Sequence, residues 1–219
     1  MGKIIVAGDI HGDWGGINSL INKHNPDYIL QCGDFGWWPG MESNKWKLKG
    51  IKSPNTKILW CDGNHEDHWD LKRGNGSYDN VIYMSRGSIY TLPDGRNILF
   101  IGGADSIDKN VRTLGIDWFP EELITYADLE KCLSHKIKID IVISHTCPEE
   151  FELKLGETYT IDKYKDPSRQ ALSVILNHYK PDLWYFGHWH MSQKGKYNNT
   201  YWQCLDMPNN SSKWWDYLK

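Results

Sequence analysis

Five of the apolar runs in this sequence are followed at once by acidic, histidine or asparagine side chains. In four of these five places a glycine adjoins the polar residues. Glycine lets the backbone turn sharply and come close to a bound group. Carboxylate, imidazole and amide groups gathered in one place could bind metal ions or transfer protons. In chain order these residues are Asp9, His11, Asp34, Asn64, His65, His145, His188 and His190.

The residue types and spacing suit a pair of metal ions. Asp9 and His11 are two residues apart, so in an extended segment both side chains point the same way, and His188 and His190 repeat that spacing. The carboxylate of Asp34 has two oxygens and can bridge two cations. Imidazole combined with carboxylate favours Mn, Fe, Zn, Co or Ni over calcium.

The elements that must position these residues are strands and helices in alternation. Near-continuous apolar runs predict strands covered on both faces. Asp13, the capping box at Thr125, and Asp166 before Pro167 each predict the start of a helix. Asn198-Asn199 predicts a two-residue hairpin turn between residues 194–197 and 200–203. The predicted strands are Lys3–Ala7, Tyr28–Cys32, Thr56–Cys61, Ile98–Gly102, Ile139–Ser144 and Leu183–Phe186.

This alternation predicts an α/β layered fold with a mixed sheet. In α/β sheets ligands bind beyond the carboxyl ends of the strands, which is where the polar residues stand. The chain has 219 residues and no linker or repeat, so we expect one domain over residues 1–219.

The composition excludes several other classes of protein. A formal net charge of −3 argues against a protein held to nucleic acid mainly by basic charge. The five cysteines are far apart and form no C-x-x-C pair, which favours free thiols in a reducing compartment. The first apolar run is interrupted by Asp9 and His11 before it could form a signal peptide or membrane span. We therefore expect a cytoplasmic protein with no membrane contact and no obligate protein partner.

The five polar blocks, taken together, resemble the calcineurin-like metallophosphoesterase superfamily. The segment from Gly102-Gly103-Ala104-Asp105-Ser106 through Arg112 to Trp118-Phe119-Pro120-Glu121 is similar to that of its smaller phage and bacterial members. One D-x-H alone arises often by chance, whereas five blocks in order at predicted strand ends are specific. The resemblance implies a β-sandwich of mixed sheets flanked by helices. The blocks are Asp9-x-His11, Gly33-Asp34, Gly63-Asn64-His65-Glu66, His145 and Gly187-His188-x-His190.

The resemblance also implies a role for each residue. Two divalent transition-metal ions (Mn, Fe, Zn, Ni or Co, with Mn²⁺ the first choice in vitro) would hold a hydroxide that attacks a phosphate ester. His65 would donate a proton to the leaving oxygen or stabilise charge on the phosphoryl group. One ion would be bound by Asp9, His11, Asp34 and His190, and the other by Asp34, Asn64, His145 and His188.

One departure from the family pattern concerns the second block. In the protein Ser/Thr phosphatase branch this block continues with an acidic residue and an arginine, but here Asp34 is followed by Phe35-Gly36-Trp37-Trp38. The departure disfavours a protein phosphatase. Arg112 is the best candidate for the missing phosphate clamp, because a guanidinium matches phosphate oxygens, with Arg86 and Arg169 as alternatives.

Tryptophans near the blocks bear on the substrate. Most tryptophans in a globular chain are packing residues, yet an aromatic wall such as Trp38 could stack a base. The leading expectation is therefore an enzyme acting on a phosphodiester or nucleotide, with nucleic acid as a further substrate. The alternatives are a phosphomonoesterase acting on phosphoproteins or small esters, and a non-catalytic scaffold. The scaffold is disfavoured because all eight site residues are present.

Overall fold

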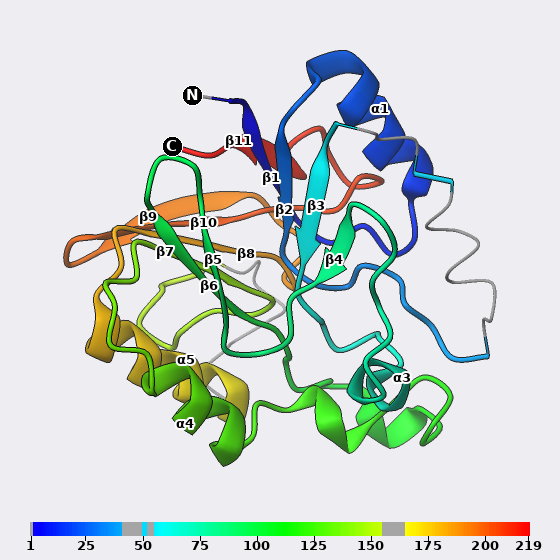
Figure 1. Cartoon of the computed structure of the whole chain (residues 1–219). Coiled ribbons are helices and arrows are strands. Elements are labelled where there is room, and N and C mark those ends of the chain that lie inside the picture. The colour runs from blue at the N-terminus through cyan, green and yellow to red at the C-terminus, as the bar shows by residue number, and fades with distance from the viewer. Residues whose placement is uncertain (1, 41–49, 52–54, 155–164) are drawn as a thin grey trace.

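The computed structural model describes residues 2–40, 50–51, 55–154 and 165–219. Two mixed β-sheets face each other and helices cover their outer faces, as expected for a sandwich of this class (Figure 1). No helix in these residues is long and apolar enough to cross a membrane. The strands are β1 (Ile4–Ala7), β2 (Tyr28–Gln31), β3 (Lys57–Trp60), β4 (Val81–Tyr83), β5 (Ser88–Thr91), β6 (Asn97–Ile101), β7 (Ile141–Ser144), β8 (Leu183–Phe186), β9 (Gln193–Tyr197), β10 (Thr200–Cys204) and β11 (Trp215–Tyr217). The helices are α1 (Trp14–His24), α3 (His68–Lys72), α4 (Tyr126–Leu133) and α5 (Pro167–Tyr179), with short 3₁₀ turns η1 (Lys109–Val111) and η2 (Pro120–Glu122).

Each sheet has a parallel centre, with an antiparallel strand at one edge of the first sheet and at both edges of the second. The first sheet has the order β11-β1-β2-β3-β4, in which only β11 is antiparallel to its neighbour. The second has the order β5-β6-β7-β8-β10-β9, in which β5 and β9 are the antiparallel strands. The parallel strands of each sheet therefore all have their carboxyl ends on the same side of that sheet.

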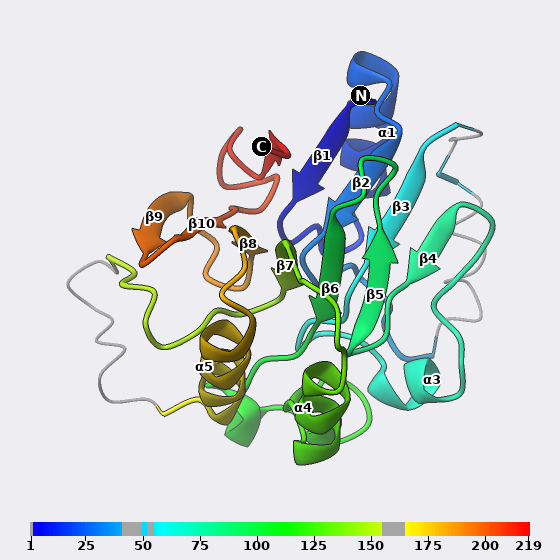
Figure 2. The ribbon, with the colours of Figure 1, turned by 60° about the vertical axis from the view of Figure 1, so that its left-hand side comes forward.

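The strands bury both of their faces, which explains their continuous apolar sequences. In β1, Ile4 and Val6 pack in the core between the two sheets, whereas Ile5 and Ala7 pack against α1. In the second sheet, Ile98 faces the inner core and Leu99 faces the outer one, where α4 and α5 lie (Figure 2). The sandwich thus has one inner core and two outer cores beneath the helices.

The six predicted strands and three predicted helices are confirmed, with ends that differ by at most two residues. Asp13 caps α1, the capping box at Thr125 starts α4, and Asp166 caps α5 with Pro167 in its first turn. The hairpin is also confirmed, since β9 and β10 pair around Asn198-Asn199. Strands β4, β5 and β11 were not predicted. They have three or four residues and lie at sheet edges, where half-exposed positions weaken the apolar pattern.

Candidate metal centre

The predicted site residues lie together at the carboxyl ends of the parallel strands, as the strand-end argument requires. Asp9 follows β1, Asp34 follows β2, and Asn64 follows β3 in the first sheet. His145 follows β7 and His188 follows β8 in the second sheet. The site is therefore built between the two sheets, with ligands from both.

The D-x-H segment Asp9–His11 and the H-x-H segment His188–His190 form turns. The prediction that these segments are extended is therefore wrong. His11, Asp34, His188 and His190 all have positive φ, between 43° and 66°. Non-glycine residues rarely adopt this left-handed conformation, and it concentrates at functional sites. As a result His188 and His190 do not point the same way. They enter two different groups of ligands.

The first ligand group consists of Asp9, His11, Asp34 and His190, whose ligand atoms all lie within 4.8 Å of one another. His190 Nε2 is 3.1 Å from Asp9 Oδ2 and 3.2 Å from His11 Nε2. His11 Nε2 is in turn 3.7 Å from Asp34 Oδ2. Hydrogen bonding to Asp9 raises the pKa of His190. Asp9 and Asp34 are buried, while His11 and His190 border solvent.

The second ligand group consists of Asn64, His145 and His188 together with Asp34. Asn64 Oδ1 is 2.9 Å from His145 Nε2 and 3.1 Å from His188 Nδ1. The two histidine nitrogens are 3.2 Å apart, and His145 Nε2 is 3.4 Å from Asp34 Oδ1. Burial, followed by the charge of His145, lowers the pKa of His188 well below its usual value. Asn64 Oδ1, His145 Nε2 and His188 Nδ1 thus lie within 3.2 Å of one another, and Asp34 Oδ1 is the fourth potential ligand atom beside them.

Asp34 lies between the two groups and faces each with a different oxygen. Oδ2 faces His11 of the first group, and Oδ1 faces His145 of the second. Burial alone would raise the pKa of Asp34, but the surrounding imidazoles, first of all that of His145, hold it well below its usual range. The carboxylate is consequently ionised at neutral pH and available to bridge two cations.

The hydrogen-bond pattern at His145 fits a cation. His145 Nδ1 lies 2.9 Å from the backbone oxygen of Cys32, which can only accept, so this nitrogen carries the proton. In the neutral ring Nε2 then has a lone pair, and it faces another acceptor, Asn64 Oδ1. A carbonyl that fixes the histidine tautomer in this way is common behind metal ligands. A positive ion would satisfy these two lone pairs, which converge in a buried site.

His65, the predicted proton donor, lies on the open side of the site. Its Nε2 is 4.0 Å from Asp34 Oδ2, and its backbone nitrogen donates to Asp34 Oδ1 at 3.0 Å. About a third of its side chain is exposed. Burial and the nearby charge of Arg112 lower the pKa of His65, against the opposing effect of Asp34. The ring is therefore within reach of a substrate group bound between the ligand groups and solvent.

Arg112 lies directly against His65, although 47 residues separate them. Its Nη1 is 3.3 Å from His65 Nδ1 and its Nη2 is 3.2 Å from His65 Nε2. The two ring nitrogens point in different directions, so the guanidinium lies across the ring rather than in its plane. Asp108 binds Nη2 at 2.8 Å. The second block lacks the acidic residue and arginine of the protein phosphatase branch. Here the segment after β6 supplies an arginine that contacts His65 and an aspartate that contacts this arginine.

The alternative arginines are already engaged elsewhere. Arg86 donates to Asp62, to Asp128 and to three backbone oxygens, and Arg169 donates to the backbone oxygens of Cys147 and Pro148. Both are buried. Neither Arg86 nor Arg169 is held against His65 as Arg112 is.

The tryptophans near the site have different surroundings. Trp37 is buried and packs near Trp60, and the Trp14 ring meets Phe35 at 4.6 Å, so both are packing residues. Trp38 is half-buried and its ring lies against Gly12, next to His11. Trp38 therefore lies beside the ligand residues, and its contact with a substrate stays a prediction, while Trp37 is a packing residue.

Two glycines leave the space that the ligands occupy. A Cβ on Gly187 would collide with Asp9 Oδ1, and a Cβ on Gly63 would collide with Asp34 Oδ1. Neither glycine has a positive φ, so the requirement at these positions is space rather than backbone freedom. Behind them, buried Glu66 accepts hydrogen bonds from the backbone nitrogens of Gly36 and Gly63 and joins the loops after β2 and β3.

Two residues that contact the site from behind were not predicted. Asn64 Nδ2 donates to Ser106 Oγ at 3.0 Å, and Ser106 Oγ donates to Glu122 Oε2 at 2.8 Å. Ser106 follows β6, which lies beside β7 in the second sheet, so the rule that places the other strand ends together also points to it. Glu122 lies in η2, and no local sequence signal marks it.

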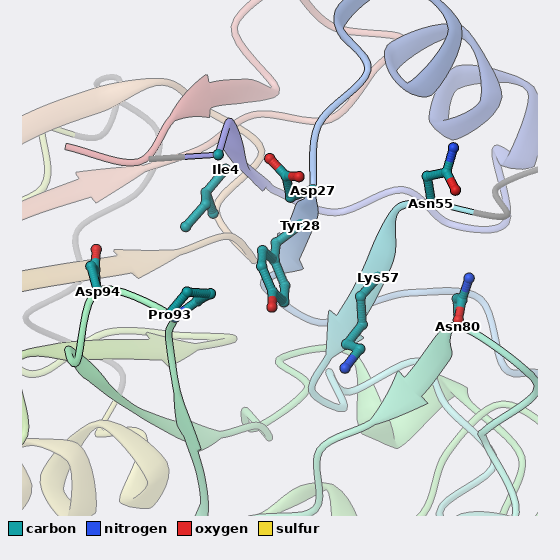
Figure 3. Close-up of a pocket in the computed structure, with 9 residues that line it drawn as sticks. Ile4, Asp27, Tyr28, Asn55, Lys57, Asn80, Pro93 and Asp94 are labelled. Atoms are coloured by element: carbon teal, nitrogen blue, oxygen red, sulfur yellow. The ribbon is translucent and has the colours of Figure 1, made fainter.

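A cavity of about 580 Å³ lies at the opposite end of the sandwich (Figure 3). It is lined by the first residues of three parallel strands, Ile4, Tyr28 and Lys57, and by residues of nearby loops such as Asp27 and Asp94. None of the predicted site residues lines it, so it is separate from the metal-ligand cluster.

Comparisons with known proteins agree with this geometry. A sequence profile described as calcineurin-like phosphoesterase matches residues 2–192. None of the curated proteins gives a match. Among solved structures, phosphopantetheinyl hydrolase from Mycobacterium tuberculosis has a TM-score of 0.62 at 14% identity, covering 99% of this chain and 95% of that one. GAP50, the anchor in the inner membrane complex of Plasmodium, has a TM-score of 0.50 at 14% identity, covering 100% and 78%.

These two structural likenesses show a shared fold, and their names differ in kind, one a hydrolase and the other an anchor. The profile covers all of the ligand residues from Asp9 to His190. By that match, and with the Asp and His cluster in place, the chain belongs to the calcineurin-like phosphoesterase family.

Proposed function

We propose that this chain is a two-metal phosphoesterase whose leading substrates are phosphodiesters or nucleotides. The observation that carries the proposal is the position of Asp34, whose two oxygens face two separate groups of ligands. The first group would hold one divalent transition-metal ion and the second group the other, with Mn²⁺ the first choice in vitro. When bound, such a pair supplies hydroxide at neutral pH and positive charge for the phosphate oxygens.

The remaining chemistry belongs to side chains on the open side of the site. His65 would give its proton to the leaving oxygen, because it lies beside the bridging carboxylate and is partly exposed. Arg112 would bind a phosphate oxygen with its guanidinium, which Asp108 already holds against His65. Asp9, Asp34 and His145 are buried and would form the floor of the site, on which the ions rest.

Two features support a substrate larger than a simple phosphate. Trp38 lies half-buried next to His11 and offers an aromatic face beside the ligand groups. A structure with the same fold is named phosphopantetheinyl hydrolase. Both features favour a phosphate that carries an organic group.

The test is a hydrolysis screen with Mn²⁺, Ni²⁺ and Zn²⁺ on aryl monoesters and diesters, cyclic nucleotides, single-stranded nucleic acid and a phosphopeptide. We expect metal-dependent turnover with a preference for diesters. A preference for monoesters or for the phosphopeptide would overturn the substrate proposal and leave the reaction class intact. Absence of hydrolysis with every metal, together with less than one bound ion per chain, would overturn the enzyme and revive the scaffold.

A further inference from the structure

A chain of buried hydrogen bonds reaches the second ligand group from the segment between β6 and α4. Asn64, Ser106 and Glu122 are all buried, with at most 3% of their surface exposed. Glu122 Oε2 accepts from Ser106 Oγ, and Ser106 Oγ lies 3.0 Å from Asn64 Nδ2. At the other end of the amide, Asn64 Oδ1 faces His145 and His188.

The direction of each hydrogen bond in this chain follows from Glu122. Its Oε1 accepts from the backbone nitrogen of Ser106 at 2.7 Å and from Trp118 Nε1 at 3.2 Å, so the carboxylate is bound at both oxygens. Burial raises the pKa of Glu122, and these hydrogen bonds oppose that shift. Because a carboxylate has no proton to give, the single hydroxyl proton of Ser106 must point to Oε2.

That direction decides which end of the Asn64 amide reaches the ligand group. With its proton used on Glu122, Ser106 Oγ can only accept from its other neighbour, so Asn64 must present its NH₂ to Ser106. The amide oxygen then faces His145 and His188. With the amide turned around, two oxygens would face each other without a proton, and two N–H donors would occupy the place of a metal ligand. A buried polar group left without a partner in this way disfavours the reversed amide.

We propose that Glu122, acting through Ser106, is a positioning residue that keeps the amide oxygen of Asn64 directed at the second ligand group. The proposal rests on the proposed function, in that this oxygen serves as a metal ligand there. Groups behind metal ligands commonly change metal affinity by about 10- to 100-fold when they are replaced.

The informative variant is Glu122→Gln, which keeps the shape and adds a donor. Its amide oxygen must take the Oε1 position, where two N–H donors point, so its NH₂ takes the Oε2 position and donates to Ser106. The hydroxyl proton of Ser106 then turns toward Asn64 and favours the reversed amide. Glu121→Gln is the matched control, because Glu121 binds Trp69 and Lys72 outside this chain of hydrogen bonds.

The first measurement is Mn²⁺ binding by the whole chain. Calorimetry gives the affinity of each ion, and metal analysis gives the number of ions bound. We expect Glu122→Gln to bind one Mn²⁺ with wild-type affinity and the second at least 10-fold more weakly, and Glu121→Gln to match the wild type. Wild-type affinity at both sites in Glu122→Gln would overturn the proposal. Should Glu122→Gln fail to fold by circular dichroism, Ser106→Ala replaces it, with weaker binding of the second ion expected and wild-type binding as the contrary result.

The second measurement is independent of metal. The side-chain amide signal of Asn64 is recorded by NMR in metal-free, ¹⁵N-asparagine-labelled protein and assigned by its loss in Asn64→Asp. We expect this signal to shift in Glu122→Gln and stay in place in Glu121→Gln, and an unmoved signal in Glu122→Gln would overturn the positioning role. If the wild type bound fewer than two ions, the proposed function would fail, and the NMR result would still decide the role of Glu122.

Discussion

At the level of single residues, Asp34 has the most demanding position in the site. It combines a left-handed backbone at φ 50° with a carboxylate that both ligand groups share. Asp79 has nearly the same backbone, at φ 49°, but precedes β4 at the opposite end of the first sheet. Asparagine tolerates this conformation, so the same substitution at both positions separates ligand loss from backbone effects.

We predict that Asp34→Asn binds Mn²⁺ at least roughly 100-fold more weakly and loses hydrolysis, because the charge that both groups share disappears and one of the groups loses its ligand oxygen. Asp79→Asn should bind metal like the wild type. Calorimetric titration of metal-free protein measures both. Wild-type affinity in Asp34→Asn would remove the bridging role.

His65 should act in the chemistry and not in metal binding. We predict that His65→Ala retains its metal ions and lowers kcat by roughly 10²- to 10⁴-fold, the usual size of general acid catalysis. Metal analysis of the purified variant, paired with steady-state kinetics on an aryl diester, tests both parts. If the variant lost its ions, His65 would be a ligand and its assigned role wrong.

Arg112 should act on the phosphate through its charge. We predict that Arg112→Ala lowers kcat/KM by about 10- to 100-fold with metal content unchanged, since a charge-assisted hydrogen bond to the phosphate is lost. Lys72→Ala is a suitable control, because Lys72 pairs with Glu121 at the surface. Unchanged kcat/KM in Arg112→Ala would show that it is not the clamp.

At the level of elements, the start of α5 carries an unusual carboxylate. Asp166 accepts a hydrogen bond from the backbone nitrogen of Ser168, and burial raises its pKa to about 6. Between the lower pKa of the unfolded chain and this value the folded state binds more protons. This group therefore makes the free energy of unfolding fall as the pH rises across that interval.

We predict that Asp166→Asn removes this loss, because asparagine also caps helices and does not ionise. Relative to wild type, the variant should gain about 2 kcal/mol in free energy of unfolding as the pH rises from about 4 to about 8. Urea unfolding at a series of pH values measures the difference. A difference that stays constant with pH would contradict the prediction.

The elements that the sequence predicts well are those with a strong local pattern. The buried parallel strands carry continuous apolar runs, and the caps at Asp13, Thr125 and Asp166 are local signals. Parallel strands in one sheet end at the same edge, so the residues that follow them are expected to lie together. That rule needs only the strand positions, and it is sufficient to gather the ligand residues into one site.

What could not be predicted depends on irregular backbone. The H-x-H spacing does not reveal that His188 and His190 enter different ligand groups, which only the family resemblance implied, because both residues have positive φ. Arg112 reaches His65 from the end of η1, and Glu122 reaches Ser106 across 16 residues through η2. Such contacts are set by the path of a loop, and single-residue propensities carry little information about that path.

At the level of the whole molecule, the ligand groups join the two sheets. Asp9, Asp34 and Asn64 come from the first sheet, and His145 and His188 from the second. An ion bound by both would stabilise the folded chain over the unfolded one by mass action.

We predict that Mn²⁺ at about 100 times its Kd raises the free energy of unfolding by roughly 2.7 kcal/mol, and that a chelator reverses the gain. Differential scanning fluorimetry with a metal series measures it as a rise in Tm. Asp34→Asn should show little of this rise. An equal rise in that variant would place the stabilising ion elsewhere.

The pairing of β11 with β1 has a consequence for how the molecule is made. Ile5 pairs with Tyr217, so β1 has one neighbour that follows it in the chain only after all of the other strands. The ligands span a similar distance, from Asp9 to His190. A nascent chain on the ribosome can form β1 through β3 early, but it holds an open sheet edge and half a cation site until the second sheet and β11 have left the exit tunnel.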